Sequence, residues 1–349
     1  MATMIDVGVI GFGLAGRAFH AQVIHATPGL RLAAIVQRGG NEAAEKYPDV
    51  RVVRSVEELL AIREIQLVVV ATPNDTHAPL ARACLEAGRD VVVDKPFATT
   101  LEEAEELVAL AKHLGRLITV YQNRRYDGDF QAIRRLVAEG TLGRIARFET
   151  NYDRFRPQLK AGAWRERRVP GAGILFDLAP HLIDHALALF GIPEAVTADV
   201  RVERDAAVVD DAFEVMLHYP HGMRAVLRST MLAAAQRPRF VLHGTRGAFV
   251  KQTFDPQEMN LRRGYIPESG AWGEEPEEDW GVLTTVENDE VVRRSVPSAS
   301  GDYRDYYANV RDAILGKAEL AIQPEYALQV MRVLELAQLS SREKRTVRW

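Results

Sequence analysis

The chain has 349 residues, of which 47% are apolar, enough to fill the cores of two domains rather than one. Its 44 Lys and Arg nearly balance 48 Asp and Glu, so the net charge of −4 gives no sign of a nucleic-acid partner. The single cysteine, Cys84, excludes an internal disulfide framework. With no apolar run of membrane length and no export signal, we expect a cytoplasmic protein without a membrane partner.

The first third of the chain alternates short β-branched runs with helix-like segments. The runs are continuous and apolar, which is typical of strands buried on both faces of a parallel sheet. Capping boxes at Ser55/Glu58 and Thr100/Glu103 predict two helix starts, and Gly115 predicts a helix end. Alternation of this length predicts an α/β fold with a doubly wound, Rossmann-type parallel sheet. The predicted strands are 7–10, 32–36, 67–71, 91–94 and 117–121.

After about residue 123, half-buried alternation replaces the continuous apolar runs. This change predicts a second, α+β domain with a large, mostly antiparallel open sheet. We therefore divide the chain into a dinucleotide-binding domain, 1–122, and a substrate-binding and oligomerisation domain, 123–349. The predicted strands are 145–152, 196–202, 212–217, 224–231 and 240–243, and the predicted helices are 130–138, 177–190, 303–315 and 325–341. Residues 264–281 predict a long loop, either a lid or a contact surface.

A glycine motif follows the first apolar run and precedes a helical pattern. Gly11 allows a tight turn, Gly13 lets the backbone approach a pyrophosphate, and Gly16 lets helix and strand pack closely. The free N–H groups and the positive end of the helix would then face the phosphates. The alternative is a purely structural glycine loop. The dinucleotide-binding residues expected here are Gly11, Phe12, Gly13, Leu14, Ala15 and Gly16.

The second predicted strand ends at Gln37 and Arg38, where an NAD enzyme carries Asp or Glu for the ribose 2′-hydroxyl. A guanidinium at this place matches a 2′-phosphate instead. A solvent-exposed loop arginine is the alternative interpretation. We expect Gln37 and Arg38 to contact the cofactor, with NADP(H) preferred and NAD(H) possible.

The predicted strand 67–71 is followed by Thr72, Pro73 and Asn74, and then by His77. Carboxyl ends of parallel strands form the ligand crevice of such sheets, so these residues are expected to face the cofactor. The same segment also suits a turn and helix cap, with Asp75 or Thr76 capping the next helix.

The predicted strand 91–94 ends at Asp94 and is followed by Lys95 and Pro96. An ammonium group at the mouth of a parallel sheet can polarise a substrate oxygen and stabilise a developing alkoxide. A cis bond before Pro96 would aim Lys95. The alternative is a strand-end lysine paired with Asp94.

In the second domain Asp177, His181 and His185 recur at i, i+4 and i+8 of a helical pattern. A carboxylate one turn from an imidazole can orient it and raise its basicity, as a general base requires. The alternatives are core histidines or metal ligands, although no second cluster completes a metal site. Pro180 predicts a helix start near Ala179, which would interrupt the stripe at Asp177.

Together these motifs resemble the Gfo/Idh/MocA oxidoreductases over essentially the whole chain. The resemblance is carried by the glycine motif, 72–77, 94–96 and the Gly173-x-x-x-Asp177-x-x-x-His181 segment. The family usually has Glu-Lys-Pro, so Asp94 is a departure that leaves the lysine in place. The resemblance implies a nicotinamide-binding first domain, with Asp94, Lys95 and Pro96 near the cofactor. It implies that Lys95, Asp177 and His181 are catalytic and contact the substrate.

Segments 13–20, 121–130, 152–157, 164–166 and 243–245 look like the NADP-dependent scyllo-inositol dehydrogenase branch. That resemblance implies a polyol or sugar substrate and a homodimer or homotetramer. It places Arg125 and Asp153 near the polyol, and Asn123, Trp164 and Arg165 near the cofactor. Reduction of a sugar or other small carbonyl is the alternative activity. A cofactor-binding regulator without turnover would not need the catalytic set.

Overall fold

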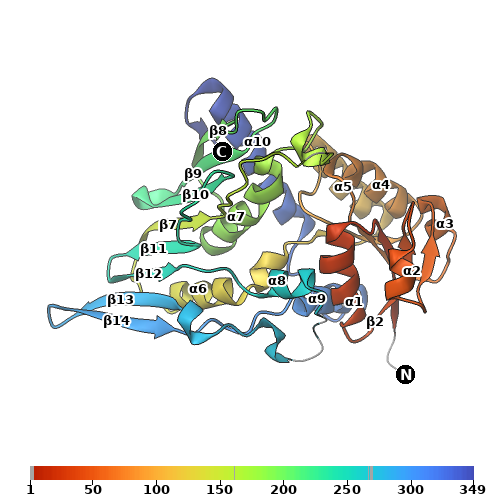
Figure 1. Ribbon diagram of the computed structural model, residues 1–349, viewed down its shortest axis with the longest axis horizontal. Helices are drawn as coiled ribbons and strands as arrows, with labels where there is room; N and C mark the ends of the chain where they lie inside the picture. Colours follow the sequence, from red (N-terminus) through yellow and green to blue (C-terminus); the bar gives the residue numbers. More distant parts are fainter. Residues whose placement is uncertain (1–3, 161, 266, 268–269) are drawn as a thin grey trace. The chain divides into compact units, whose positions relative to one another are not determined.

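The computed structural model describes residues 4–160, 162–265, 267 and 270–349, and these fall into two compact units (Figure 1). The first unit combines Met1–Asn123 with Gln257–Trp272 and Asp302–Leu328, and the second takes Arg124–Pro256, Gly273–Gly301 and Gln329–Trp349. The sequence pattern divides the chain once, after residue 122. The compact units differ from that division because two later segments join the N-terminal part.

The first unit is built on a parallel sheet which, in the described residues, has six strands in the order β3-β2-β1-β4-β5-β6. The order reverses at β1, so the predicted doubly wound fold is confirmed. All residues of β1 are buried, which explains why its sequence is apolar apart from Asp6. The strands are β1 (Ile5–Ile10), β2 (Leu30–Val36), β3 (Arg51–Val53), β4 (Ile65–Val70), β5 (Asp90–Val93) and β6 (Ile118–Val120).

Helices connect these strands, as the alternating pattern predicts. A π-helical segment, Ala15–Ala21, leads directly into the first α-helix. The helices are α1 (Gln22–His25), α2 (Glu42–Lys46), α3 (Val56–Leu60), α4 (His77–Glu86) and α5 (Leu101–Leu114). The later segments of this unit add α8 (Gln257–Arg262) and α9 (Arg304–Ile314).

The ends of α5 form as predicted. Thr100 Oγ1 accepts the Glu103 N–H at 3.1 Å, and Glu103 Oε2 accepts the Thr100 N–H at 3.2 Å. Gly115 ends the helix in the left-handed region, with φ at 62°. At α3 only half of the predicted box forms: Ser55 accepts the Glu58 N–H, but the Glu58 carboxylate accepts the N–H of Arg54.

The predicted side-chain cap of α4 is wrong. Thr76 stands at the N-cap position without making a side-chain cap hydrogen bond. Its hydroxyl instead contacts the hydroxyl of Thr72 at 2.7 Å and donates to the carbonyl of Pro73 at 2.6 Å. These contacts close the turn after β4, so the hydroxyl is used within the turn rather than by the helix.

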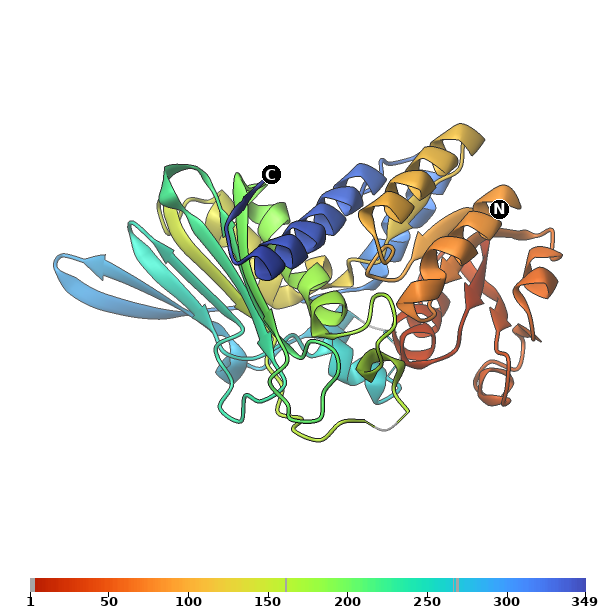
Figure 2. The same ribbon diagram turned by 90° about the horizontal axis from the view of Figure 1, so that it is seen from above.

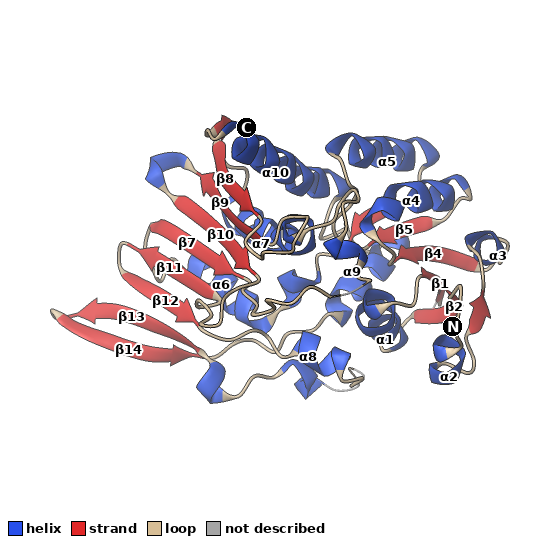
Figure 3. Ribbon diagram, turned by 45° about the horizontal axis from the view of Figure 1, so that its top comes forward, coloured by secondary structure: helices blue, strands red, loops and turns tan. Residues whose placement is uncertain are grey.

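The second unit is built on a mixed sheet, with nine strands in the part of the chain that the structure describes (Figure 3). Among the strands that the structure describes here, only β10 and β7 pair in parallel, so the expected large and mostly antiparallel sheet is confirmed. Along the sheet, the strands lie in the order β14-β13-β12-β11-β7-β10-β9-β8-β15. They are β7 (Ile145–Asn151), β8 (Ala195–Arg201), β9 (Ala212–His218), β10 (Arg224–Thr230), β11 (Phe240–Gly244), β12 (Gly247–Lys251), β13 (Gly281–Glu287), β14 (Glu290–Val296) and β15 (Val347–Arg348).

Helices α6 (Gly128–Ala138) and α7 (Ile174–Phe190) lie on one face of this sheet (Figure 2). In β9, Phe213, Val215 and Leu217 are buried toward that face, whereas Glu214 and Met216 alternate onto the opposite face. This alternation is the signal by which the sequence predicts β9. The sequence-based prediction lacks β12, β13 and β14, which lie at one edge of the sheet, and β15, which lies at the other.

The predicted loop 264–281 includes residues 266, 268 and 269, which lie outside the described residues. Its described part contains short 3₁₀ turns at Gly270–Gly273 and Glu277–Asp279. The chain then continues through β13 and β14 to α9, and finally to α10 (Pro324–Glu343), which contributes residues to both units. In the described part of the chain, no helix is both long and apolar enough to cross a membrane.

Candidate active site

The glycine motif forms a tight turn between β1 and the helical residues 15–25. Gly11 has φ of +100°, and a Cβ there would lie 2.5 Å from the carbonyl oxygen of Ala71. A Cβ on Gly16 would lie 1.9 Å from the carbonyl oxygen of Gly11, whereas a Cβ on Gly13 would meet nothing within 4 Å. Two glycines therefore close the turn and the third leaves its outer side open. This arrangement fits a backbone cradle for a pyrophosphate.

Alanine at Gly13 and at Gly16 is expected to have different effects. Gly16→Ala should lower the free energy of unfolding by about 1–3 kcal/mol, because its methyl group overlaps the Gly11 carbonyl. Gly13→Ala should fold normally but bind NADPH about three- to tenfold more weakly, because its methyl group occupies the open side of the turn. Urea unfolding and a fluorescence titration with NADPH measure the two quantities. An unchanged NADPH affinity in Gly13→Ala contradicts the cradle.

Side-chain hydrogen bonds within the first unit hold the loop after β2 in place. The Gln37 side chain is buried, accepts the Ala43 N–H at 2.9 Å and donates to the carboxylate of Glu42. Arg54 donates to the carbonyl oxygens of Gln37 and Gly40 at 2.9 and 2.7 Å, which braces the backbone on both sides of Arg38. The Arg38 side chain itself is exposed. Arg38 is therefore presented by a fixed loop, while Gln37 is engaged inside it.

His77 joins the ends of β4 and β5. Its Nδ1 lies 2.7 Å from the carbonyl oxygen of Pro96, and its Nε2 lies 3.0 Å from that of Thr72. Burial lowers the pKa of His77, an effect that Asp94 opposes, so the ring is neutral near pH 7 and donates to one carbonyl. Asn74, in the intervening turn, is also buried. His77 thus supports the backbone of the predicted cofactor segment.

Asp94 and Lys95 follow β5 directly, and the Lys95–Pro96 peptide bond is cis, as predicted. Asp94 Oδ1 accepts the backbone N–H of Lys95 at 2.8 Å. The same oxygen lies 3.8 Å from Nε2 of His20, a buried residue of the π-helical segment. The carboxylate is therefore engaged with the backbone of the lysine that follows it.

In the second unit, Gly173 and Asp210 set the start of α7. The carbonyl oxygen of Asp210 accepts the Ile174 N–H at 2.9 Å, and its Oδ2 accepts the Leu175 N–H at 2.7 Å. Gly173 has φ of +87°, and a Cβ there would lie 2.1 Å from Oδ1 of Asp210. A glycine before this helix is therefore required by the close approach of its capping carboxylate.

Asp210 is expected to make stability depend on pH. Burial raises its pKa to about 6, although the Leu175 N–H bond acts in the opposite direction. Between about pH 4 and the folded pKa the folded chain binds more protons than the unfolded chain, so stability falls as pH rises through this window. Asp210→Asn keeps an acceptor oxygen but does not titrate. At pH 7.5 its free energy of unfolding should exceed that of the wild type by about 1–3 kcal/mol.

Urea unfolding of both proteins between pH 4 and pH 7.5 measures this effect. Asp210→Leu serves as the control, because it lacks the acceptor for Leu175 and should be less stable than Asp210→Asn at every pH. Equal pH slopes in the wild type and Asp210→Asn contradict the assignment.

Helix α7 runs without a break through Pro180, so the prediction of a helix start near Ala179 is wrong. The helix is almost entirely buried in its first three turns, and this packing outweighs the backbone hydrogen bond that Pro180 cannot make. Asp177 and His181 therefore lie one turn apart on one helix. His181 is buried, with 6% of its surface exposed.

The Asp177 carboxylate contacts two arginines. Its Oδ2 accepts from Nη1 of Arg154 at 3.3 Å, and its Oδ1 accepts from Nε of Arg165 at 3.1 Å. Arg154 lies just after β7. No motif or spacing in the sequence predicts that it pairs with Asp177. The arginine charges offset part of the field that Asp177 exerts on neighbouring groups.

His185, one turn beyond His181, is a core histidine. It is fully buried, its ring stacks on Phe130 with a centroid distance of 4.3 Å, and its Nε2 lies 3.3 Å from the carbonyl oxygen of Arg124. Burial holds its pKa well below the usual range, so the neutral ring donates to that carbonyl. Of the alternatives for this helix, the core interpretation applies to His185.

Arg125 and Asp153 each form an ion pair that contains more than one hydrogen bond. The sequence does not predict either partner. Arg125 Nε and Nη2 each donate to Asp184 Oδ1, at 3.0 and 2.9 Å, and Nε also contacts Oδ2. Asp153 accepts from Nε and Nη2 of Arg237 at 2.7 and 2.6 Å. Such pairs fix the direction of both planar groups.

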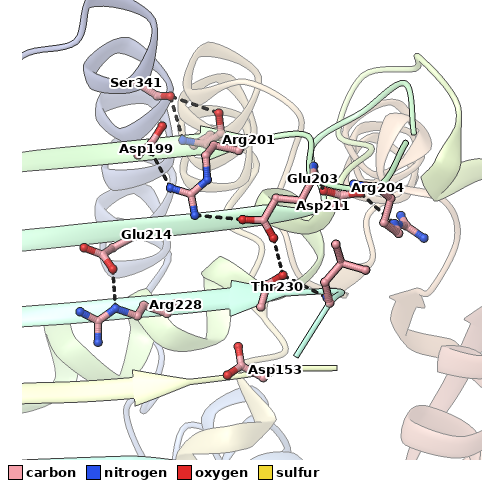
Figure 4. Close-up of polar contacts among 12 residues, drawn as sticks. Asp153, Asp199, Arg201, Glu203, Arg204, Asp211, Glu214, Arg228, Thr230 and Ser341 are labelled. Carbon is pink, nitrogen blue, oxygen red and sulfur yellow. Dashed lines mark hydrogen bonds and ion pairs between the residues drawn. The ribbon is translucent and has the colours of Figure 1, made fainter. Parts of the chain in front are cut away.

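Trp164 and Arg165 lie in a short 3₁₀ turn, Trp164–Glu166, with the Arg165 guanidinium 4.6 Å from the Trp164 ring centroid. The turn is anchored by Glu166, which accepts from buried Arg204 at 2.8 Å. Arg204 in turn donates to Asp211 at 2.8 Å, beside Glu203 (Figure 4). Asn123, the last residue of the first unit's N-terminal segment, is buried.

The predicted residues are distributed over both units. Within the first, the glycine turn, the loop after β2 and the ends of β4 and β5 all follow the carboxyl ends of neighbouring parallel strands. Within the second, α7 presents Asp177 and His181. Sequence reasoning misses the residues that contact the predicted site residues or the backbone around them. These are His20, Arg54, Arg154, Asp210 and Arg237.

Comparison with protein families gives matches in both parts of the chain. Residues 5–122 match the model described as "Oxidoreductase family, NAD-binding Rossmann fold". Residues 134–348 match "Oxidoreductase family, C-terminal alpha/beta domain". The two matches together cover most of the chain.

Individual relatives match along the full length. The chain is 46% identical to the uncharacterized oxidoreductase YdgJ of Escherichia coli, with 99% of each chain covered. It is 38% identical to scyllo-inositol 2-dehydrogenase (NADP(+)) IolW of Bacillus subtilis, over 98% of this chain and 95% of that one. The solved structure of the oxidoreductase yvaA from Bacillus subtilis matches with a TM-score of 0.96 and 37% identity, covering 100% of this chain and 99% of that chain.

Proposed function

Because the chain belongs to the Gfo/Idh/MocA oxidoreductase family, we propose that it is an NADP-dependent dehydrogenase of a cyclic polyol, with scyllo-inositol and its ketone as the substrate pair. In oxidation, a CH–OH carbon gives up a hydride and its oxygen gives up a proton, leaving a ketone. One observation carries the choice of substrate: the full-length relative from Bacillus subtilis is named for this activity.

The first unit provides the cofactor site in this proposal. The open side of the turn at Gly13 receives the pyrophosphate, and Arg38 binds the 2′-phosphate. The residues after β4 and β5, Thr72 to Asn74 and Asp94 to Pro96, line the nicotinamide end. The bound nicotinamide supplies or accepts the hydride. The side chains of the protein supply position, charge and proton transfer.

His181 is the acid–base residue. In oxidation its imidazole takes the proton of the substrate hydroxyl, and in reduction it returns that proton to the oxygen. The ammonium group of Lys95 donates a hydrogen bond to the same oxygen and stabilises negative charge that develops on it. His181 suits proton transfer because an imidazole nitrogen can both accept and donate a proton.

Asp177 favours the protonated imidazole and helps to orient it from one helical turn away. Because Asp177 also contacts Arg154 and Arg165, its charge is shared among three cationic partners when His181 is protonated. We therefore assign it a smaller part of the rate than His181. Arg125 and Asp153 contact the polyol hydroxyls, with Asp184 and Arg237 fixing their directions.

Initial rates of NADP⁺ and NAD⁺ reduction with scyllo-inositol, myo-inositol, glucose and no substrate test this function. Turnover of scyllo-inositol with NADP⁺ preferred over NAD⁺ is the expected result. Binding of NADPH without turnover of any polyol contradicts the polyol assignment. NADPH oxidation with a panel of sugar ketones then separates a sugar reductase from a cofactor-binding regulator, because only the reductase consumes NADPH.

The open face of the second unit's sheet is the surface we assign to self-association, giving a homodimer or homotetramer. On this face Arg228 contacts Glu214 at 2.5 Å, and Arg201 contacts Asp199 at 2.6 Å (Figure 4). Fixed, alternating charges of this kind can pair with a second copy of the same face. Sedimentation velocity of the wild type tests the assembly, and a monomer at micromolar concentration contradicts it.

A further inference from the structure

A chain of buried polar groups leads from α9 to the backbone of Lys95, entirely within the first unit. The hydroxyl of Tyr307, on α9, lies 2.6 Å from Nδ1 of His20. Nε2 of His20 lies 3.8 Å from Oδ1 of Asp94, and that oxygen accepts the Lys95 N–H at 2.8 Å. Tyr307 and His20 are both fully buried, so the contact between them is formed away from solvent, whereas the Asp94 side chain is 16% exposed.

The surroundings of His20 hold its ring in one place. The residue lies in the π-helical segment Ala15–Ala21, a rare geometry that often marks functional positions. Its ring packs against Tyr121 with centroids 4.4 Å apart and meets Tyr307 edge-on. The hydroxyl of Tyr121 donates to the carbonyl oxygen of Phe19 at 2.9 Å, which ties the π-helical segment to the end of β6.

The chemistry of these groups sets the direction of the hydrogen bond between Tyr307 and His20, and with it the tautomer of the His20 ring. Burial raises the pKa of Tyr307 well above its usual range, so its hydroxyl keeps its proton and can donate to Nδ1 of His20. The tautomer protonated at Nε2 then turns an N–H toward Asp94. Burial alone would raise the pKa of Asp94, but His20 and Lys95 outweigh it and keep the carboxylate ionised.

We propose that His20 is a positioning residue of the reaction: held by Tyr307, it fixes the Asp94 carboxylate, which in turn fixes the backbone from which Lys95 extends. The proposal rests on the proposed role of Lys95 in hydride transfer. It adds a residue from the glycine-motif helix to the support of the oxygen-binding ammonium group. A displaced Lys95 loses its contact with the reacting oxygen, so turnover falls even when the cofactor still binds.

Two substitutions separate the two nitrogens of His20. In His20→Asn the amide takes the place of Nδ1 and can still meet Tyr307, but nothing faces Asp94. In His20→Gln the amide reaches the place of Nε2 and can still face Asp94. With scyllo-inositol and NADP⁺, kcat of His20→Asn should fall about 10- to 100-fold, while His20→Gln should stay within about threefold of the wild type. NADPH affinity should change little in either variant.

Hydrogen exchange supplies a readout that does not depend on activity. The Lys95 amide is protected because it donates to Asp94 Oδ1, so its exchange rate by NMR should rise at least about tenfold in His20→Asn. The amides of Val92 and Val93, inside β5, should keep their rates. Tyr219→Phe controls for the loss of a buried hydrogen bond away from Lys95. It removes a buried hydroxyl of the second unit, which donates to the carbonyl oxygen of Gly191.

The outcomes distinguish this proposal from the proposed function. If Lys95→Met is inactive but His20→Asn keeps normal turnover and normal Lys95 exchange, the positioning role is overturned and the function stands. Equal losses of kcat in His20→Asn and His20→Gln, in proportion to lost thermal stability, also overturn it. If Lys95→Met turns over scyllo-inositol normally, the proposed function is wrong, and the exchange measurement still decides whether His20 controls Asp94.

Discussion

Replacing His181 by asparagine is expected to lower kcat by about 10²- to 10⁴-fold, the range that general acid–base catalysis contributes. Asparagine keeps a polar group on α7 but does not exchange a proton near neutral pH. Because His181 is buried, with 6% of its surface exposed, the smaller asparagine loses part of the packing around the ring, so folding is checked separately from turnover. Initial rates with scyllo-inositol and NADP⁺ give kcat. Circular dichroism and an NADPH titration should show a folded protein with nearly unchanged cofactor affinity.

His113→Ala is the matched control, because this histidine is exposed on α5 and belongs to no proposed site. Its kcat should equal that of the wild type. Lys95→Met should also lose turnover by about 10²-fold or more, since it removes the charge that stabilises the reacting oxygen. Near-normal turnover in folded His181→Asn and Lys95→Met proteins would falsify the role assignment. Asp177→Asn should lose less, because Arg154 and Arg165 already offset its charge.

The parts of the site that sequence alone predicts are those that depend on local order. A buried strand, a glycine turn and a helix follow one another along the chain at Gly11 to Gly16, so their arrangement needs no distant partner. Lys95 follows a buried strand in the same way. The doubly wound order of the first sheet also follows from alternation of short elements.

Side-chain pairs that are far apart in the sequence cannot be predicted in this way. Asp177 and Arg154 are 23 positions apart, and Asp153 and Arg237 are 84 apart, so no spacing rule connects them. The error at Pro180 has a related cause: helix propensity is local, whereas the burial that keeps α7 continuous comes from tertiary packing. Likewise, segments 257–272 and 302–328 join the first unit through contacts that composition does not reveal.

The preference for NADP⁺ over NAD⁺ should depend strongly on one exposed side chain, that of Arg38. Arg38 follows β2, where no acidic residue is available for a ribose hydroxyl, and Arg54 braces the loop through the Gln37 and Gly40 carbonyls. A guanidinium–phosphate contact is worth about 1.5–3 kcal/mol. Arg38→Ala should therefore raise KM for NADP⁺ about 10- to 100-fold. The KM for NAD⁺, which has no 2′-phosphate, should change little.

The ratio of kcat/KM for the two cofactors measures this selectivity directly. Arg63→Ala, which removes another exposed guanidinium of the first unit, should leave the ratio unchanged and so controls for general loss of positive charge. Raising ionic strength should weaken NADP⁺ binding more in the wild type than in Arg38→Ala, because the exposed ion pair is screened by salt. An unchanged cofactor ratio in Arg38→Ala would mean that Arg38 is a solvent-exposed loop residue. The 2′-phosphate would then have to be recognised elsewhere in the first unit.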